Sequence, residues 1–140
     1  MFNDLFDEQP AKRSPGAASP VSATKLIESC KAFGWLANER DRAVMIEFRH
    51  ANGDITALAY PLLESVKFNP STGITLHFSG STVTITGTNL NIEVQPGGKL
   101  FEGITRHRVV WIQEMKEMTD TEPLENEPMI DEITITQGKP

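Results

Sequence analysis

Apolar and polar side chains alternate along most of residues 43–113, and this period of two restricts the fold more than any other feature of the chain. In the first run, Ile46 and Phe48 alternate with Glu47 and Arg49. Successive side chains of a β-strand point to opposite faces, so this alternation is typical of a strand with one buried face and one wet face. The sequence therefore predicts an antiparallel, predominantly β domain.

Turn signals separate the alternating runs. The pair Asn52-Gly53 predicts a tight hairpin turn, and Gly73 and Gly80 end further runs. Pro61 has no N–H to donate, so we expect a strand to end or bend there. The expected strands cover residues 43–49, 55–60, 62–69, 74–79, 82–86 and 90–94, with a bulge at Gly87.

Two segments have helical rather than alternating spacing. Leu26, Ile27, Cys30 and Phe33 recur at intervals that predict an amphipathic helix over residues 22–36. A second, short helix is expected over residues 99–106. The β-branched and aromatic run 108–113 favours a strand, although Met115 and Met118 are also compatible with a helix over 108–118.

Together these elements predict a mainly β fold with one or two short helices. Six to seven antiparallel strands would form a small curled sheet or a partly open barrel, with Trp35 and Trp111 as packing anchors. This strand pattern resembles the small barrel of the pleckstrin-homology type. The resemblance is one of pattern and implies a fold rather than a function.

Composition divides the chain into a domain and two tails. Residues 1–22 and 119–140 hold few large apolar side chains, so we expect both to be disordered around a single domain over 23–118. Acidic and basic residues balance within 24–118, and the net charge of −6 comes mainly from residues 119–140. A neutral domain tends to self-associate, and an acidic tail favours solubility.

The same composition excludes several partners and locations. An acidic chain without a basic stripe is a poor ligand for phosphates, so we expect no nucleic-acid binding and no binding to membrane surfaces. No apolar run is long enough to span a bilayer. The first residues are acidic where a signal peptide is basic, and the single Cys30 precludes an intrachain disulfide. These features predict a cytoplasmic protein.

No motif for catalysis is present in the sequence. His50, His77 and His107 lack the spacing of metal ligands, and Cys30 lies on the apolar side of the expected helix, where a thiol is inert. Neither a nucleophile elbow nor a phosphate-binding loop occurs. We therefore expect no metal and no cofactor, and the enzyme hypothesis is not favoured.

The one basic cluster, Arg106-His107-Arg108, lies at the end of the short helix expected over 99–106, and Lys99 lies at the start of that helix. Basic side chains near a helix start are suited to an anion such as a lipid or nucleotide headgroup. Glu102 and Glu114 balance part of this charge. An ordinary charged surface is therefore the favoured interpretation, and anion binding is the alternative.

The C-terminal tail contains a strand-like segment over residues 129–136. Ile133 and Ile135 alternate with threonines there, and Ile130 precedes them. Such a segment is suited to adding a strand to a sheet edge of this chain, of a second copy or of another protein.

The leading functional hypothesis is a non-catalytic protein-binding or assembly module, in which Ile130, Ile133 and Ile135 contact a protein partner or a second copy. One alternative is a small enzyme or a ligand-binding barrel with a pocket near His77 and His107. Another is a binder of anionic headgroups through the basic cluster.

Overall fold

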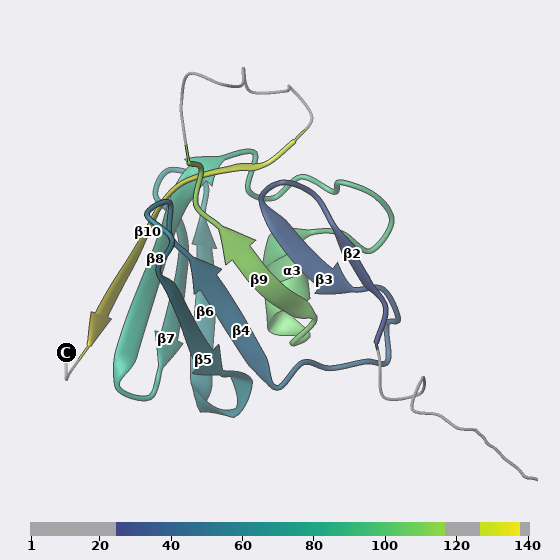
Figure 1. Ribbon diagram of the computed structural model, residues 1–140, viewed down its shortest axis with the longest axis horizontal. Coiled ribbons are helices and arrows are strands. Elements are labelled where there is room, and N and C mark those ends of the chain that lie inside the picture. The colour runs from purple at the N-terminus through teal and green to yellow at the C-terminus, as the bar shows by residue number, and fades with distance from the viewer. Residues whose placement is uncertain (1–24, 117–126, 138–140) are drawn as a thin grey trace, which may run out of the picture.

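The computed structural model describes residues 25–116 and 127–137 (Figure 1). These residues form a five-stranded sheet, a four-stranded sheet and one α-helix, which confirms the predicted mainly β class. The expected N-terminal tail over 1–22 lies outside the described residues. So do residues 119–126 and 138–140 of the expected C-terminal tail.

The five-stranded sheet places a late strand between two early ones. Its order is β2-β3-β9-β4-β5, with β9 antiparallel to β3 and parallel to β4. The β4–β5 hairpin turns at Asn52-Gly53 as predicted, and Gly53 has a φ of 100°, which side chains disfavour. The strands are β2 (Ile27–Ser29), β3 (Phe33–Leu36), β4 (Met45–Arg49), β5 (Ile55–Ala59) and β9 (Val109–Gln113).

The four-stranded sheet has the order β10-β8-β7-β6 and is antiparallel throughout. The segment predicted to be strand-like forms β10 and pairs with β8 of the same chain. A bulge was expected at Gly87 of β8. The register shift lies instead on the neighbouring strand β10, between Ile130 and Glu132. The strands are β6 (Leu63–Asn69), β7 (Gly73–Phe78), β8 (Ser81–Thr88) and β10 (Met129–Gln137).

The core lies between the two sheets and behind β3 and β9. Phe48 of β4 meets Phe78 of β7 edge to face, with ring centroids 6.4 Å apart. The helix α3 (Leu100–Thr105) lies behind β9 and β3 (Figure 1). Gly103 of α3 packs directly on Val109 of β9. A Cβ at Gly103 would overlap the Val109 side chain, so glycine permits this close approach. The four-stranded sheet therefore covers the part of the five-stranded sheet around β4, and α3 covers the part around β9 and β3.

A buried corner carries the chain from one sheet to the other. β5 runs into the 3-10 helix η2 (Tyr60–Leu62), and β6 follows at once, so Pro61 ends a strand as predicted. The hydroxyl of Tyr60 donates to the carbonyl of Val109 at 2.7 Å, and Tyr60 is 1% exposed. This hydrogen bond ties the corner to the centre of the five-stranded sheet.

The helix predicted over residues 22–36 is wrong, and the segment forms β2 and β3 instead. Phe33 and Trp35 are buried, whereas Leu26 and Ile27 are 70% and 50% exposed. The apolar residues of this segment therefore fit a period of two as well as helical spacing. Gly34 lies between the two inward-facing aromatic rings. Tertiary packing of those rings outweighs local spacing.

The short helix over 99–106 and the strand over 108–113 are confirmed as α3 and β9, but the strand over 90–94 is wrong. Local turns satisfy the backbone there, since Val94 N–H donates to the Gly98 carbonyl at 3.0 Å. The described residues hold more strands than the six to seven predicted, arranged in two packed sheets. The pleckstrin-homology pattern is not confirmed. Neither helix within 25–116 and 127–137 could cross a bilayer, being too short and too polar.

Candidate functional site

The four residues of the predicted anion site do not form one free cluster. Lys99 precedes α3 and Arg106 follows it, so the two lie at opposite ends of the helix, about 10 Å apart along its axis. Arg106 forms an exposed ion pair with Glu102 at 3.4 Å. His107 and Arg108 continue into the turn before β9.

Arg108 is buried and engaged with the main chain. It is 4% exposed, and its Nε and Nη2 donate to the Leu36 carbonyl at 3.0 and 2.7 Å. Nη2 also donates to the carbonyl of Ala37 at 3.3 Å. The guanidinium of Arg108 therefore fixes the end of β3 and is not presented to a ligand.

The two histidines of the predicted pocket lie on different elements. His107 stacks on Tyr60 with ring centroids 4.4 Å apart, and burial, followed by the charge of Arg42, lowers the pKa of His107. His77 lies on β7 and alternates with inward-facing side chains. A hollow of about 500 Å³ lies beside the β6–β7 turn, lined by residues 68–73, 86–87, Leu90 and Asp131. Neither histidine lines this hollow.

Cys30 is half-buried between β2 and β3. Burial raises the pKa of the Cys30 thiol, which disfavours the thiolate that a nucleophile or a metal ligand requires. Within the described ranges, no group of three His, Cys, Asp or Glu side chains is placed to hold a metal ion.

The three isoleucines of the C-terminal segment face the core of their own chain. Ile130 and Ile133 are 1% and 4% exposed, and Ile135 packs against the same cluster. These side chains hold β10 on β8. In this conformation they are not presented to a partner.

A carboxylate closes part of the outer edge of β10. Glu114, which follows β9, accepts hydrogen bonds from the backbone N–H of Ile133 and of Ala51, both at 2.8 Å. The Met115 N–H donates to the Ile130 carbonyl at 2.9 Å. One acidic side chain thus joins β10, the β4–β5 turn and the end of β9.

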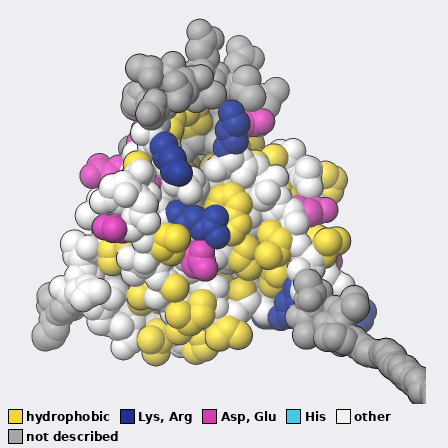
Figure 2. All heavy atoms as spheres, in the orientation of Figure 1, with side chains coloured by type: hydrophobic (Ala, Val, Ile, Leu, Met, Phe, Trp, Pro, Cys, Tyr) yellow, Lys and Arg dark blue, Asp and Glu magenta, His cyan; other side chains and the backbone are white. Residues whose placement is uncertain are grey.

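No helix or strand of the described residues packs on one side of the five-stranded sheet, and we call this side the outer face. The register places Glu47 beside Trp111 and Ala57, and Arg49 beside Gln113 and Ile55. Figure 2 looks onto this side, where an apolar area adjoins acidic and basic side chains. The outer face comprises Gly34, Met45, Glu47, Arg49, Ile55, Ala57, Ala59, Trp111 and Gln113.

Trp111 lies flat across β3 at the centre of the outer face. A Cβ at Gly34 would overlap the indole of Trp111, so glycine is required beneath the ring. The guanidinium of Arg49 lies over the ring, 4.7 Å from its centroid, at cation–π distance. Trp111 is therefore held between a glycine backbone and a cation.

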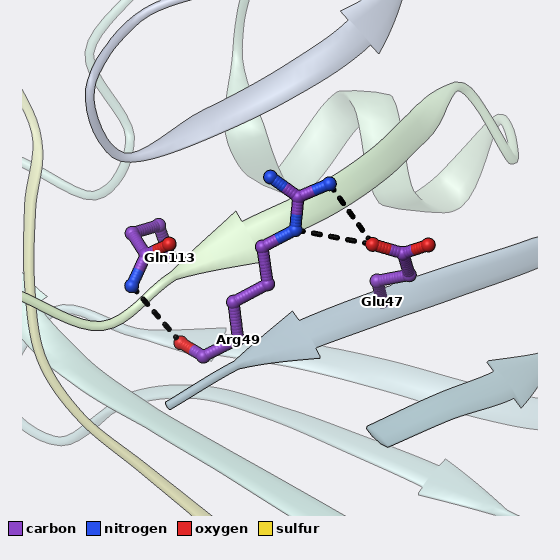
Figure 3. Close-up of polar contacts among 3 residues, drawn as sticks. All are labelled: Glu47, Arg49 and Gln113. Atoms are coloured by element: carbon purple, nitrogen blue, oxygen red, sulfur yellow. Dashed lines mark hydrogen bonds and ion pairs between the residues drawn. The ribbon is translucent and has the colours of Figure 1, made fainter. Parts of the chain in front are cut away.

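Glu47 fixes the position of Arg49. Its Oε1 accepts from Nη2 and Nε of Arg49 at 2.9 and 3.1 Å, and both side chains are partly exposed. Figure 3 shows Arg49 rising from β4 to meet Glu47, while the amide of Gln113 donates to the Arg49 carbonyl at 3.4 Å. Hydrogen bonds and the cation–π contact thus fix the relative positions of Trp111, Arg49 and Glu47.

Large apolar side chains border these three residues. Met45 and Ile55 on the outer face are 43% and 58% exposed, and Val44 just before β4 is 69% exposed. Scattered exposed apolar residues are ordinary, whereas several beside a partly exposed tryptophan are typical of a contact surface.

Sequence reasoning missed this surface because it treated Trp111 as a packing anchor. A signal was present, since Glu47 and Arg49 occupy the polar phase of their strand and Gly34 interrupts an aromatic run. The pairing of β9 with β4 is parallel and distant in sequence. Only that pairing brings Trp111 next to Arg49.

Comparisons with known protein families, with curated proteins and with solved structures give no significant match for this chain. The interpretation of the site therefore depends on its own geometry.

Proposed function

We propose that this chain is a non-catalytic protein-binding module and that the outer face of the five-stranded sheet is its binding surface. The observation that supports this proposal is the position of Trp111, flat on Gly34 and beneath Arg49, on a face that the described residues leave uncovered. Tryptophan and arginine dominate the binding energy of protein interfaces, where they act as rigid anchors.

The electrostatics of the outer face favour a protein partner over an anion. Glu47 neutralises Arg49, so the contact between Arg49 and Trp111 at the centre of the face carries little local net charge. Met45 and Ile55 add exposed apolar area on its flank. Tryptophan, methionine and arginine are among the residue types enriched at protein interfaces.

The rival functions find less support in the geometry. Arg108 donates to main-chain carbonyls and Arg106 pairs with Glu102, which leaves Lys99 alone of the three basic residues expected to bind an anionic headgroup. Neither His77 nor His107 lines the hollow beside the β6–β7 turn. A cytoplasmic location accords with the single Cys30.

Capture from a native lysate tests the proposed surface. The full chain, Trp111→Ala, Arg49→Ala and the control Lys67→Ala are immobilised, and retained proteins are quantified by mass spectrometry. Lys67 lies exposed on β6, in the other sheet. Loss of a central anchor costs about 2 kcal/mol of binding free energy, so we expect the two outer-face variants to retain a specific protein at least about tenfold less than the control.

The proposal fails if all four chains retain the same proteins in equal amounts. Circular dichroism of each variant, compared with that of the full chain, shows whether a loss of capture reflects the surface or unfolding.

A further inference from the structure

Within the part of the chain that the structure describes, the edge strand β5 has unpaired backbone groups along its whole length. His50 N–H donates to the Asp54 carbonyl and Tyr60 N–H donates to the Val44 carbonyl, which fixes the hydrogen-bonded pairs of the β4–β5 hairpin. Because such pairs alternate along an antiparallel ladder, the N–H and C=O groups of Ile55, Ala57 and Ala59 point away from β4. No strand among the described residues lies beside them.

The other three edges are protected, and β5 is not. β6 carries exposed Glu64 and Lys67, and β2 has only three residues with Glu28 at its centre. β10 has a register shift at Asp131 and the Glu114 carboxylate on its outer side. Charges, short length and bulges are the devices that prevent edge pairing. β5 reads Ile-Thr-Ala-Leu-Ala, without charge, proline or bulge.

We propose that β5 pairs with β5 of a second copy of this chain, antiparallel and centred on Ala57. A two-fold axis at Ala57 places Ile55 of each copy opposite Ala59 of the other. All three outward-pointing residues are then hydrogen-bonded, with about six backbone bonds across the axis. The two five-stranded sheets become one continuous sheet across the two chains.

The side chains of this register complement one another. On the outer face Met45 lies beside Ala59, so Ile55 of the second copy would cover a small residue next to an exposed methionine. Met45 and Ile55 are 43% and 58% exposed, and both would lose contact with water. At the axis, Ala57 meets Ala57, where no larger side chain obstructs the backbones.

The charge distribution permits this contact between two acidic chains. Glu47 is the nearest acid in the row of Ala57, and it lies on β4 rather than on β5. Two copies of Glu47 would be three strand spacings apart, about 14 Å, which exceeds the Debye length of about 8 Å at physiological salt. Each Glu47 is also paired with Arg49.

This inference goes beyond the proposed function because it depends on the backbone of β5 rather than on Trp111. Pairing at β5 would place two copies of the outer face side by side. A partner carrying two equivalent contact segments would then bind more tightly than a partner carrying one.

Sedimentation velocity of the full chain tests the proposal over about a hundredfold range of concentration. We expect the wild-type mass to rise towards that of a dimer. Ala57→Lys adds a charge at the axis and should remain monomeric, while the matched control Ser65→Lys, exposed on β6, should behave as wild type. A wild-type monomer at every concentration, or an Ala57→Lys variant that dimerises as readily, overturns the proposal.

Cysteine cross-linking tests the register without relying on a lysine variant that folds. In a Cys30→Ala background, Ala57→Cys would place two Cα atoms about 5.5 Å apart, within disulfide range. Ile55→Cys would place them more than about 14 Å apart, which is outside that range. Oxidation should give dimers with Ala57→Cys and not with Ile55→Cys. Equal yields, or no dimer with Ala57→Cys, overturn the proposal, whereas the capture experiment with Trp111→Ala tests the proposed function separately.

Discussion

β10 and β5 are both edge strands, yet only β10 is closed to further pairing. β10 buries Ile130 and Ile133 and receives the Glu114 carboxylate on its outer side. β5 exposes Ile55 and leaves three residues without partners among the described residues. The contrast shows that protection of an edge depends on specific side chains and not on the position of a strand in its sheet.

Truncation of one isoleucine on each edge gives the largest expected difference. Ile130→Ala should lower the free energy of unfolding by about 3 kcal/mol, because its side chain is 1% exposed within the core. Ile55→Ala removes a side chain that is 58% exposed and should change the stability of the monomer by less than about 0.5 kcal/mol. Urea unfolding of dilute protein measures both. Equal losses would show that β5 is as well covered as β10.

Removal of the carboxylate that closes β10 should have a smaller effect. Glu114→Ala leaves the N–H groups of Ile133 and Ala51 without their acceptor, at a cost of about 2 kcal/mol in unfolding free energy. The control Glu64→Ala removes an exposed acid from β6 and should be neutral within about 0.5 kcal/mol. Thermal and urea unfolding compare the two variants. A neutral Glu114→Ala would mean that water replaces the carboxylate at this edge.

Amide exchange distinguishes the two edges without any change in stability. The Ile133 N–H donates to Glu114, whereas the Ala57 N–H points away from β4. We expect the Ala57 amide to exchange faster in dilute protein, by about tenfold or more. Its protection should increase with protein concentration as copies pair, while that of Ile133 should stay constant. Slow exchange at Ala57 in the monomer would show that β5 is covered.

Much of the fold could be predicted because its determinants are local. Alternation located most of the strands, and the Asn52-Gly53 pair located the β4–β5 turn. The helix expected over 22–36 failed because Phe33 fits both the helical spacing from Cys30 and the alternation with Trp35, and only burial in the core decides between them. Local spacing carries no information about such contacts.

The candidate site was far less predictable. It depends on β9 lying parallel to β4, a pairing between segments about 60 residues apart that no hairpin signal announces. Arg108 shows the same limit in reverse. Its place in a basic cluster indicated a surface role, yet the fold turns its guanidinium onto the carbonyls of Leu36 and Ala37.

The insertion of β9 between β3 and β4 also determines when this protein can fold. A chain emerging from the ribosome completes β3 and β4 early, but these two strands do not pair with each other. The middle of the sheet stays open until Gln113 has been synthesised, so the exposed strands must wait for nearly the whole domain. Assembly is therefore dominated by sequence-distant contacts, and we expect refolding to be slow, on a timescale of milliseconds to seconds.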